Sequence, residues 1–266
     1  MSLLRVRILG CGSSGGVPRV ASGWGACDPA NPRNRRRRCS VLVEQTNGSG
    51  ATSVLVDTSP DLREQLLDAG VTQLDSVLFT HQHADHTHGI DDLRPLVIAM
   101  RQRIPVYADR VTSDLLFARF GYCFDAPPGS SYPPILEAHL LKPGEPIRIQ
   151  GAGEPLEALP FQVVHGDIDA LGFRFGKIGY VPDVSFVPED CIPYLEGLEV
   201  LIIDALRFTP HPTHFSVADA LAFIERVKPQ RAVLTNLHSD LDYETLRRQL
   251  PSNVEPAFDG MVVEAR

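Results

Sequence analysis

The sequence predicts a single α+β domain in which two β-sheets lie between helices. Three observations lead to this fold. Short apolar strands alternate with helical segments, the two halves of the chain repeat this alternation, and no linker of disordered composition separates them. Because every sheet has to bury its apolar face against another layer, we expect residues 1–266 to form one domain with a shared core.

The first half of the chain is expected to contain five strands and three helices. An Asn-Gly-Ser-Gly turn at residues 47–50 indicates a hairpin between the second and third strands. Ser59 can cap the first helix, with Pro60 at its first position and Gly70 just past its end. The strands are expected at residues 5–9, 40–44, 53–56, 77–79 and 106–108, and the helices at residues 60–69, 85–94 and 111–120.

The second half is expected to begin with a surface loop and to continue with six strands and two helices. Residues 126–146 carry six prolines and two glycines, a composition typical of a loop. The later strands are short apolar runs, separated by glycines and polar turns. They are expected at residues 161–164, 171–175, 177–181, 200–203, 231–234 and 261–263, and the helices at residues 216–227 and 241–250.

Bulk composition narrows the class of function and the compartment. The formal net charge is −8, whereas an extended nucleic-acid surface usually needs a basic domain, so we expect no such surface. The five cysteines contain no C-x-x-C pair, which predicts neither a zinc ribbon nor a disulfide framework. The N-terminus lacks a signal-peptide stretch, and no apolar run reaches the ~20 residues of a membrane helix. We therefore expect a cytoplasmic protein without a membrane partner, and a homodimer is left open.

The strongest functional signal is the segment THQHADH at residues 80–86, which directly follows an apolar strand. Imidazole and carboxylate groups suit zinc, manganese, iron or nickel. Alternate side chains of an extended segment share a face, so His81 and His83 can bind one ion together. A turn into a helix then directs Asp85 and His86 to another side, where they can bind a second ion. The alternative, a polar surface loop, would explain one histidine better than this spacing.

Two metal sites need further ligands, and three strand ends in the later chain offer them. His165, Asp183 and His238 each stand at the end of a short apolar strand. A strand that stops at the edge of a sheet presents its polar residue on a rigid scaffold. Taken singly, each of these residues can be an ordinary cap or a surface side chain. Their order, His, Asp, His, makes the metal-binding interpretation more specific.

This set of residues resembles the ligands of the metallo-β-lactamase superfamily in order and approximate spacing, over nearly the whole chain. The resemblance implies a four-layer αββα sandwich, with two mixed sheets flanked by helices and the site at one edge. It also implies two divalent transition metal ions, zinc or manganese. The first ion would bind His81, His83 and His165, the second would bind Asp85, His86 and His238, and Asp183 would bridge them.

A closer resemblance is to the phosphodiesterase branch of this superfamily. The segments LGCGSSGGVP at residues 9–18, VDTSPD at 56–61 and TPHPTH at 209–214 are similar to those of the phosphoribosyl cyclic phosphate phosphodiesterases. These enzymes are related to the transfer-RNA 3′-processing endonucleases. The chain departs from them at residues 24–29, where Cys27 stands alone in place of a cysteine cluster that holds a structural metal. It also offers no candidate insertion for an extended RNA-binding arm.

The reaction that we expect is hydrolysis of a small cyclic phosphate or a nucleotide-like phosphodiester. Two cations roughly 3.5–4 Å apart can clamp a phosphodiester and generate a bridging hydroxide at neutral pH. The expected catalytic residues are His214, Asp85 and His211. The resemblance favours His214 as the proton donor to the leaving alkoxide, and His211 can orient the phosphate or replace His214 as donor. The alternative for His214 is a polar residue at a helix N-terminus without a chemical role.

Two other classes of function stay open. One is a ribonuclease or thioesterase on the same scaffold, and the other is a non-catalytic protein that binds nucleotides. A complete ligand set disfavours the second class. Two local roles also stay open. Asp57 either supports the histidine segment through hydrogen bonds or caps its own turn, and the four arginines at residues 35–38 either meet an anionic substrate or pair with acidic neighbours.

Overall fold

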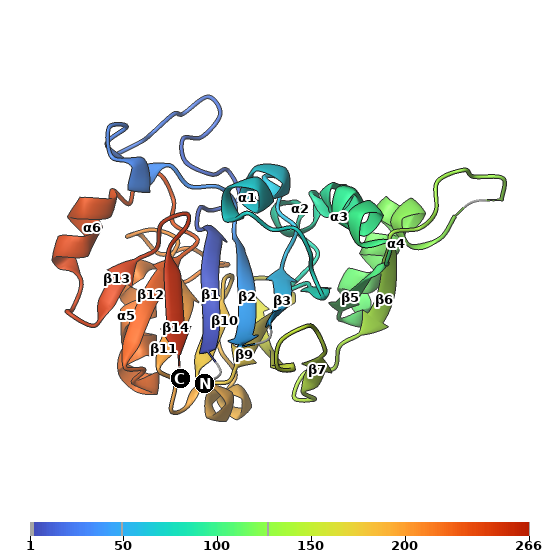
Figure 1. Cartoon of the computed structure of the whole chain (residues 1–266). Coiled ribbons are helices and arrows are strands. Elements are labelled where there is room, and N and C mark those ends of the chain that lie inside the picture. Colours follow the sequence, from blue (N-terminus) through green and yellow to red (C-terminus); the bar gives the residue numbers. More distant parts are fainter. Residues whose placement is uncertain (1–2, 49, 127, 266) are drawn as a thin grey trace.

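The computed structural model describes residues 3–48, 50–126 and 128–265. In these ranges the chain forms two mixed, seven-stranded sheets that stack face to face, with helices on their outer faces (Figure 1). The four-layer αββα sandwich expected from the sequence is confirmed. The element bounds differ from the predicted ones at several places, and these differences have local physical causes.

The first sheet has an antiparallel half and a parallel half. In spatial order it contains β14 (Val262–Ala265), β1 (Leu3–Gly10), β2 (Ser40–Asn47), β3 (Gly50–Val56), β4 (Ser76–Leu78), β5 (Ile104–Ala108) and β6 (Leu136–Leu140). The strands from β14 to β3 pair antiparallel, and those from β3 to β6 pair parallel. The predicted hairpin joins β2 to β3, with Asn47 opposite Gly50.

The second sheet repeats this plan. In spatial order it contains β13 (Val254–Pro256), β12 (Arg231–Thr235), β11 (Val200–Asp204), β10 (Ile178–Val181), β9 (Ile168–Phe175), β8 (Leu156–His165) and β7 (Ile147–Ile149). The strands from β7 to β10 pair antiparallel, and those from β10 to β13 pair parallel. The repeated plan explains the similar alternation of elements in the two halves of the sequence.

The core consists of three apolar layers, one between the two sheets and one on the outer face of each sheet. Alternate residues of a strand belong to different layers. Val54 and Val56 of β3 belong to the cluster between the sheets, whereas Leu55 packs with the helices outside the first sheet. In β11, Ile202 faces the other sheet and Leu201 faces the outer helices. Successive side chains of a strand point to opposite faces, so each strand buries residues on both sides. All five cysteines are buried in these layers or beside them, with free thiols.

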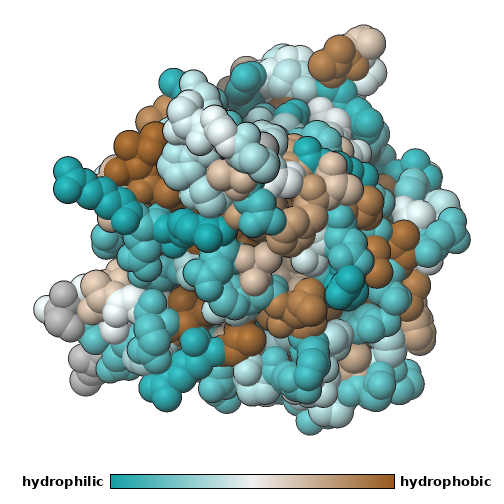
Figure 2. Space-filling model, turned by 90° about the vertical axis from the view of Figure 1, so that its right-hand side faces the viewer, coloured by the Kyte–Doolittle hydropathy of each residue, from teal (hydrophilic) through white to brown (hydrophobic). Residues whose placement is uncertain are grey.

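Six α-helices lie in the described ranges, and none of them is long and apolar enough to cross a membrane. They are α1 (Leu62–Ala69), α2 (Ala84–Thr87), α3 (Arg94–Met100), α4 (Arg110–Phe124), α5 (Val217–Val227) and α6 (Tyr243–Gln249). α1, α3 and α4 cover the first sheet, and α5 and α6 cover the second. The side of the molecule that carries α4 and β6 exposes hydrophobic residues scattered among hydrophilic ones (Figure 2).

The first helix starts later than predicted. α1 begins at Leu62 and not at Pro60, because the Oγ of Ser59 accepts a hydrogen bond from the backbone N–H of Asp61 (3.1 Å) and closes a turn before the helix. Its predicted end is confirmed, since Gly70 follows Ala69 in the left-handed conformation with φ of 67°. Glycine adopts this conformation without a steric penalty, which makes it the usual residue after a helix.

The helix expected at residues 85–94 is divided into α2, a 3-10 turn at Ile90–Leu93, and α3. Gly89 lies at the break, where a Cβ atom would come within 2.0 Å of the carbonyl oxygen of Ser59. Pro95 does not end a helix but lies in the first turn of α3, where a backbone N–H has no helical partner to lose. The close approach of the Ser59 backbone, which lies far away in sequence, decides the break.

The proline-rich segment at residues 126–146 is not wholly a loop, because it contains β6. β6 pairs in parallel with β5 and forms an edge of the first sheet. An edge strand needs hydrogen-bond partners on only one side, so prolines before and after it are tolerated. β7 and β13, each of three residues, were not predicted either, because strands this short carry too little periodicity to be recognised.

A buried arginine fastens the long loop after β1 to the second sheet. Arg36 is 2% exposed, and its guanidinium donates hydrogen bonds to the carbonyl oxygens of His238 (3.2 Å) and Leu241 (2.7 Å). The two arginines that follow Arg36 behave as the second interpretation of the arginine run predicts, because Arg37 pairs with an acid, Asp68. Arg38 likewise pairs with Asp61. The two terminal nitrogens of Arg36 instead find acceptors inside the protein, which a buried charge requires, while its Nε has no hydrogen-bond partner among the described residues.

Replacing Arg36 with methionine should lower the free energy of unfolding by about 2–4 kcal/mol, because buried carbonyl oxygens lose their charged donor. The matched variant is Arg35→Met, which removes an exposed neighbour and should change the free energy of unfolding by less than about 0.5 kcal/mol. Urea-induced unfolding followed by circular dichroism measures both. Equal losses in the two variants would contradict the structural role of Arg36.

Candidate metal centre

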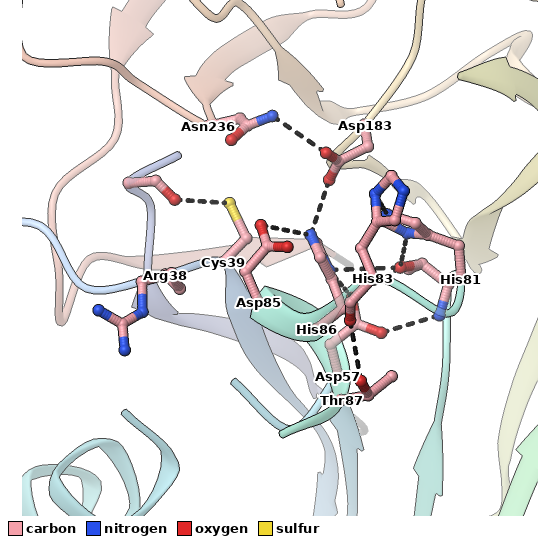
Figure 3. A network of polar contacts seen from close by, with 12 residues as sticks. Arg38, Cys39, Asp57, His81, His83, Asp85, His86, Thr87, Asp183 and Asn236 are labelled. Atoms are coloured by element: carbon pink, nitrogen blue, oxygen red, sulfur yellow. Dashed lines mark hydrogen bonds and ion pairs between the residues drawn. The ribbon is translucent and has the colours of Figure 1, made fainter. Parts of the chain in front are cut away.

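The polar residues singled out in the sequence converge because their strands run in the same direction and end at one edge. In the first sheet, the parallel strands β3 and β4 lead to Asp57 and to the histidine segment. In the second sheet, β8, β10 and β12 share one direction and lead to His165, Asp183 and His238. Residues from both sheets therefore meet above the core (Figure 3).

One group of imidazoles forms from both halves of the chain. Nε2 of His81 lies 3.0 Å from Nδ1 of His83, which in turn lies 3.3 Å from Nε2 of His165. One nitrogen from each of the three rings lies within 4.8 Å of the others. Because the segment is extended here, His81 and His83 project on the same side, as the two-residue spacing predicts. This group offers three neutral ligands to one cation.

A second group joins the histidine segment to Asp183. Nε2 of His86 lies 3.1 Å from Oδ2 of Asp183 and 3.5 Å from Oδ2 of Asp85. Oδ1 of Asp183 lies 3.9 Å from Nε2 of His165, in the first group. The carboxylate of Asp183 therefore lies between the two groups, and Figure 3 shows it directed toward His86. This is the position that a bridging ligand requires.

Hydrogen bonds fix the second nitrogen of several rings. Nδ1 of His86 bonds to Oδ2 of Asp57 (2.7 Å), and Nδ1 of His165 bonds to the carbonyl oxygen of Thr213 (2.7 Å). Asp57 also accepts hydrogen bonds from the backbone N–H and the hydroxyl of Thr80, both at 2.8 Å. Such partners orient a ligand ring and leave its other nitrogen free for a metal. Of the two roles left open for Asp57, support of the histidine segment is therefore the one that the structure favours.

The charges of the site fit a cation. Nε2 of His86 and Oδ2 of Asp183 are buried and lie 3.1 Å from each other as an ion pair, but neither atom has a partner in hydrogen-bond geometry among the described residues. Burial opposes a charge on His86, but the carboxylates of Asp183, Asp57 and Asp85 outweigh this effect and raise the pKa of His86 well above its usual range. Burial, reinforced by His86, lowers the pKa of His81, so that its imidazole is in the neutral, ligand-forming state. A metal ion would supply the positive charge that these carboxylates favour.

His238 and His211 line the same cavity as these groups but stand apart from them. The cavity has a volume of about 320 Å³, and His83, Asp85, His165 and Asp183 line it as well. Nδ1 of His238 forms a short contact with a carboxylate oxygen of Asp240, which leaves Nε2 available. The structure does not bring His238 within ligand distance of Asp85 and His86 in any three-residue group of the described chain. His211 accepts a hydrogen bond from Thr213 and lies beside the His214 ring.

Asp204, the partner of His214, was not among the site residues predicted from the sequence. Nδ1 of His214 donates to Oδ2 of Asp204 over 2.8 Å, and the same nitrogen lies 3.7 Å from Oδ1 of Asp183. Burial raises the pKa of Asp204 to about 7, although the hydrogen bond from His214 opposes this rise. Burial acts to lower the pKa of His214. The hydrogen bond to Asp204 outweighs burial, so that the pKa of His214 is raised above its usual value. Asp204 ends an apolar strand, as Asp183 follows one, and this signal is visible in the sequence.

Asn236 connects the two aspartates. Its side-chain amide donates to Oδ1 of Asp183 (3.3 Å) and to Oδ1 of Asp204 (3.2 Å). Its backbone is in the left-handed region, with φ of 61°. Asparagine tolerates this region better than most residues, and the bend lets the chain leave β12 toward His238. Asn236 thus fixes the distance between the carboxylates while it turns the chain.

Replacing Asp183 with alanine should deplete the bound metal, because one carboxylate faces both ligand groups. We expect about two transition metal ions per chain in the unmodified protein and less than half of that in the variant. His139→Ala, which removes a partly exposed histidine on β6 outside the site, should retain full occupancy. Inductively coupled plasma mass spectrometry after gel filtration measures the content. Equal metal content in Asp183→Ala and the unmodified protein would refute the bridging position.

Comparison with known proteins identifies the family. Residues 52–236 match the family model of the beta-lactamase superfamily domain. The chain is 32% identical over 263 residues to an octanoyltransferase of Porphyromonas gingivalis, covering 97% of this chain and 51% of that protein. It is 31% identical over 149 residues to a ribonuclease Z of a Bradyrhizobium species, covering 54% and 46%. The chain spans about half the length of these curated relatives.

A solved structure, described as a new diphosphatase from the PhnP family, is similar along its whole length. The likeness covers 100% of this chain and 98% of the other, with 35% sequence identity and a TM-score of 0.89. The family match extends from β3 to the end of β12 and thus includes the histidine segment, His165 and Asp183. The strand ends that build the site are therefore part of a shared framework, and the protein belongs to the beta-lactamase superfamily, with the metallo-β-lactamase fold.

Proposed function

We propose that the protein is a dinuclear, metal-dependent phosphodiesterase that hydrolyses a small cyclic phosphate or nucleotide-like phosphodiester. The observation that carries the proposal is the hydrogen-bonded pair of His214 and Asp204 next to the two ligand groups. His214 lines the same cavity as Asp183 and His165, so that an acid and a cation site face the same space. A cavity of about 320 Å³ suits a small ester.

The two groups of histidine and aspartate side chains that meet at Asp183 would each hold one metal ion. When bound, two zinc or manganese ions would act as Lewis acids on the phosphoryl group and lower the pKa of a water molecule. His238 would reach its ion through Nε2, since its Nδ1 is engaged with Asp240. The remaining ligands would be His81, His83 and His165 on one side, Asp85 and His86 on the other, and Asp183 between them.

The residues of the chain would then position the substrate and move the protons. A water oxygen forms a bond to phosphorus while the bond from phosphorus to the leaving oxygen breaks. The electron pair of the broken bond stays on the leaving oxygen, which takes a proton from Nε2 of His214. The water proton is released to solvent, from which His214 is protonated again. Asp204 accepts the Nδ1 proton of His214, which orients the ring and stabilises the imidazolium whose Nε2 carries the proton that is transferred.

The finer assignment, to the branch of phosphoribosyl cyclic phosphate phosphodiesterases, is supported by the segments at residues 9–18, 56–61 and 209–214 and by the PhnP-family relative. Cys27 marks a difference within this branch. Its thiol donates to the carbonyl oxygen of Ser239 (3.4 Å), and the guanidinium of Arg36 stands 3.8 Å away. A fixed positive charge beside the single thiol disfavours a third, structural metal at this place.

A second candidate is hydrolysis of a diphosphate diester, in which the bond between two phosphoryl groups is broken. The similar PhnP-family structure is described as a diphosphatase, which favours this reaction. The same ligand groups would serve, because the reacting centre is again a phosphoryl group. A phosphate monoester is a better leaving group than an alkoxide and depends less on a proton donor. The two candidates therefore differ in how much they need His214.

Replacing His214 with alanine should lower kcat for an alkyl phosphodiester by about 10²–10⁴-fold, the usual contribution of a positioned acid. The loss should be less than tenfold for an aryl ester, whose leaving group needs no proton. Asp204→Asn should reproduce the same pattern more weakly, since the amide oxygen can still accept from Nδ1 of His214 but no longer carries the negative charge that stabilises the protonated ring. Steady-state kinetics with both esters measure the effect, and metal content serves as the control. Equal losses on both esters would remove His214 as the acid.

A substrate panel tests the proposal as a whole. Metal-loaded protein should hydrolyse cyclic phosphates, linear phosphodiesters or dinucleoside diphosphates, and prior treatment with a chelator should abolish this activity. Activity that survives complete removal of metal would refute the mechanism. Turnover of a thioester or a structured RNA alone would point to the thioesterase or ribonuclease alternatives. Tight binding of nucleotides without any turnover would instead indicate a binding protein.

A further inference from the structure

Two cavities adjoin at the candidate metal centre. The inner one is the cavity of about 320 Å³ that the metal ligands line, and a second one of about 570 Å³ lies outside it. Ser14, Arg19 and Asp85 line both cavities and so mark their junction. A substrate that fills the inner cavity and extends past these three residues would place its remote part in the outer one.

Arg19 is an unpaired cation at this junction. No hydrogen bond or ion pair of its guanidinium occurs within the described residues. Its backbone is fixed by two hydrogen bonds with Gly23, both of 2.8 Å. The two other arginines of these cavities are engaged, because Arg207 donates to the carbonyl oxygens of its own loop and Arg38 pairs with Asp61 at 3.0 Å. Among the described residues that line these two cavities, Arg19 is the arginine whose guanidinium has no partner.

The guanidinium of Arg19 lies against the glycine-rich turn. A Cβ atom at Gly15 would lie 2.7 Å from Nε of Arg19 and 2.9 Å from its Cζ, so a glycine here leaves room for the side chain as it stands. This turn is closed by a hydrogen bond from the N–H of Gly16 to the carbonyl oxygen of Ser13 (2.7 Å). The side chain of Arg19 therefore lies next to the turn that carries Ser13 and Ser14.

A second polar group points to a ligand at the same place. Ser13 is only 4% exposed and lines the inner cavity, yet its hydroxyl has no hydrogen-bond partner among the described residues. A buried hydroxyl without a partner is costly, unless a ligand or water completes it. Ser13 precedes Ser14, which lies at the junction with Arg19. The hydroxyl of Ser13 and the guanidinium of Arg19 thus line the inner cavity together with His83, Asp85, His165 and Asp183.

The outer cavity differs in character from the inner one. Val20, Pro60 and Ala84 give it apolar walls, and His88 adds a flat, polar ring. Arg38, which is held by Asp61, lines its far side. Such a mixture suits a nucleoside or another flat group with polar edges. It offers little to a metal, since Asp85 is the single carboxylate among its lining residues.

We propose that Arg19 binds the second phosphoryl group of a diphosphate diester, whose remote nucleoside-like group occupies the outer cavity. This inference rests on the second candidate of the proposed function, hydrolysis of a diphosphate diester, and names how that substrate would lie in the two cavities. Water attacks the phosphorus in the inner cavity, the bond from this phosphorus to the bridging oxygen breaks, and the electron pair leaves with the outer phosphate. Arg19 stabilises the charge that develops there, and its planar fork matches two phosphate oxygens. The products are two phosphate monoesters.

The test compares binding and turnover in Arg19→Ala, Arg19→Lys and a matched control. The control is Arg148→Ala, an exposed arginine on β7 that lines neither cavity. The binding probe is a dinucleoside diphosphate with a methylene group in place of the bridging oxygen, measured by calorimetry on metal-loaded protein. We expect the Kd to rise about 10- to 100-fold in Arg19→Ala, less in Arg19→Lys, and not at all in the control.

Turnover measurements show whether Arg19 acts on the second phosphoryl group or on the phosphoryl group that reacts. In Arg19→Ala, kcat/KM should fall at least tenfold for the dinucleoside diphosphate and less than twofold for bis(4-nitrophenyl) phosphate, which has a single phosphoryl group. An equal loss on both substrates, or an unchanged Kd for the methylene analogue, would overturn the inference. If the unmodified protein hydrolyses neither substrate, the proposed function fails, whereas the binding comparison still decides the role of Arg19.

Discussion

Buried carboxylates and imidazole nitrogens that converge to within ion-binding distance need a positive charge among them, and the rest of the site depends on this constraint. Asp183 lies at the centre of it, 4% exposed, with His86 on one side and His165 on the other. Burial lowers the pKa of His86, but Asp183, Asp57 and Asp85 outweigh burial and raise it, so these carboxylates favour a positive charge at this place. Bound cations would meet the same requirement with more ligands.

The two-sheet architecture is what makes this convergence possible. The histidine segment belongs to the first sheet, and Asp183 and His165 belong to the second, so neither sheet holds the site alone. Strands that run in one direction end at one edge, and their polar residues emerge above a packed apolar core. Asp57 accepts hydrogen bonds from Thr80 and His86 and thereby fixes the histidine segment to its sheet. The ligand atoms are thus held by the core rather than by flexible loops.

The long loop after β1 completes the site from above. Arg36 anchors it through the carbonyl oxygens of His238 and Leu241, and its glycine-rich beginning carries Ser13 and Arg19 into the cavities. The chain as a whole has a net charge of −8, yet its cavities present arginine and histidine side chains. Local placement of charge, rather than the total, decides whether an anionic substrate is attracted. Bound cations would strengthen the same local field.

The sequence by itself determined the features that depend on near neighbours. The spacing of His81, His83, Asp85 and His86 follows from strand and helix geometry, and the hairpin at residues 47–50 and the glycine after α1 follow from turn chemistry. Only the tertiary structure decided which distant groups pair. Asp204 with His214, Arg36 with Leu241, and the break at Gly89 all depend on residues brought together by packing. The periodicity of apolar residues indicates which face of a helix or strand is buried, but it does not indicate which distant residues pack against that face.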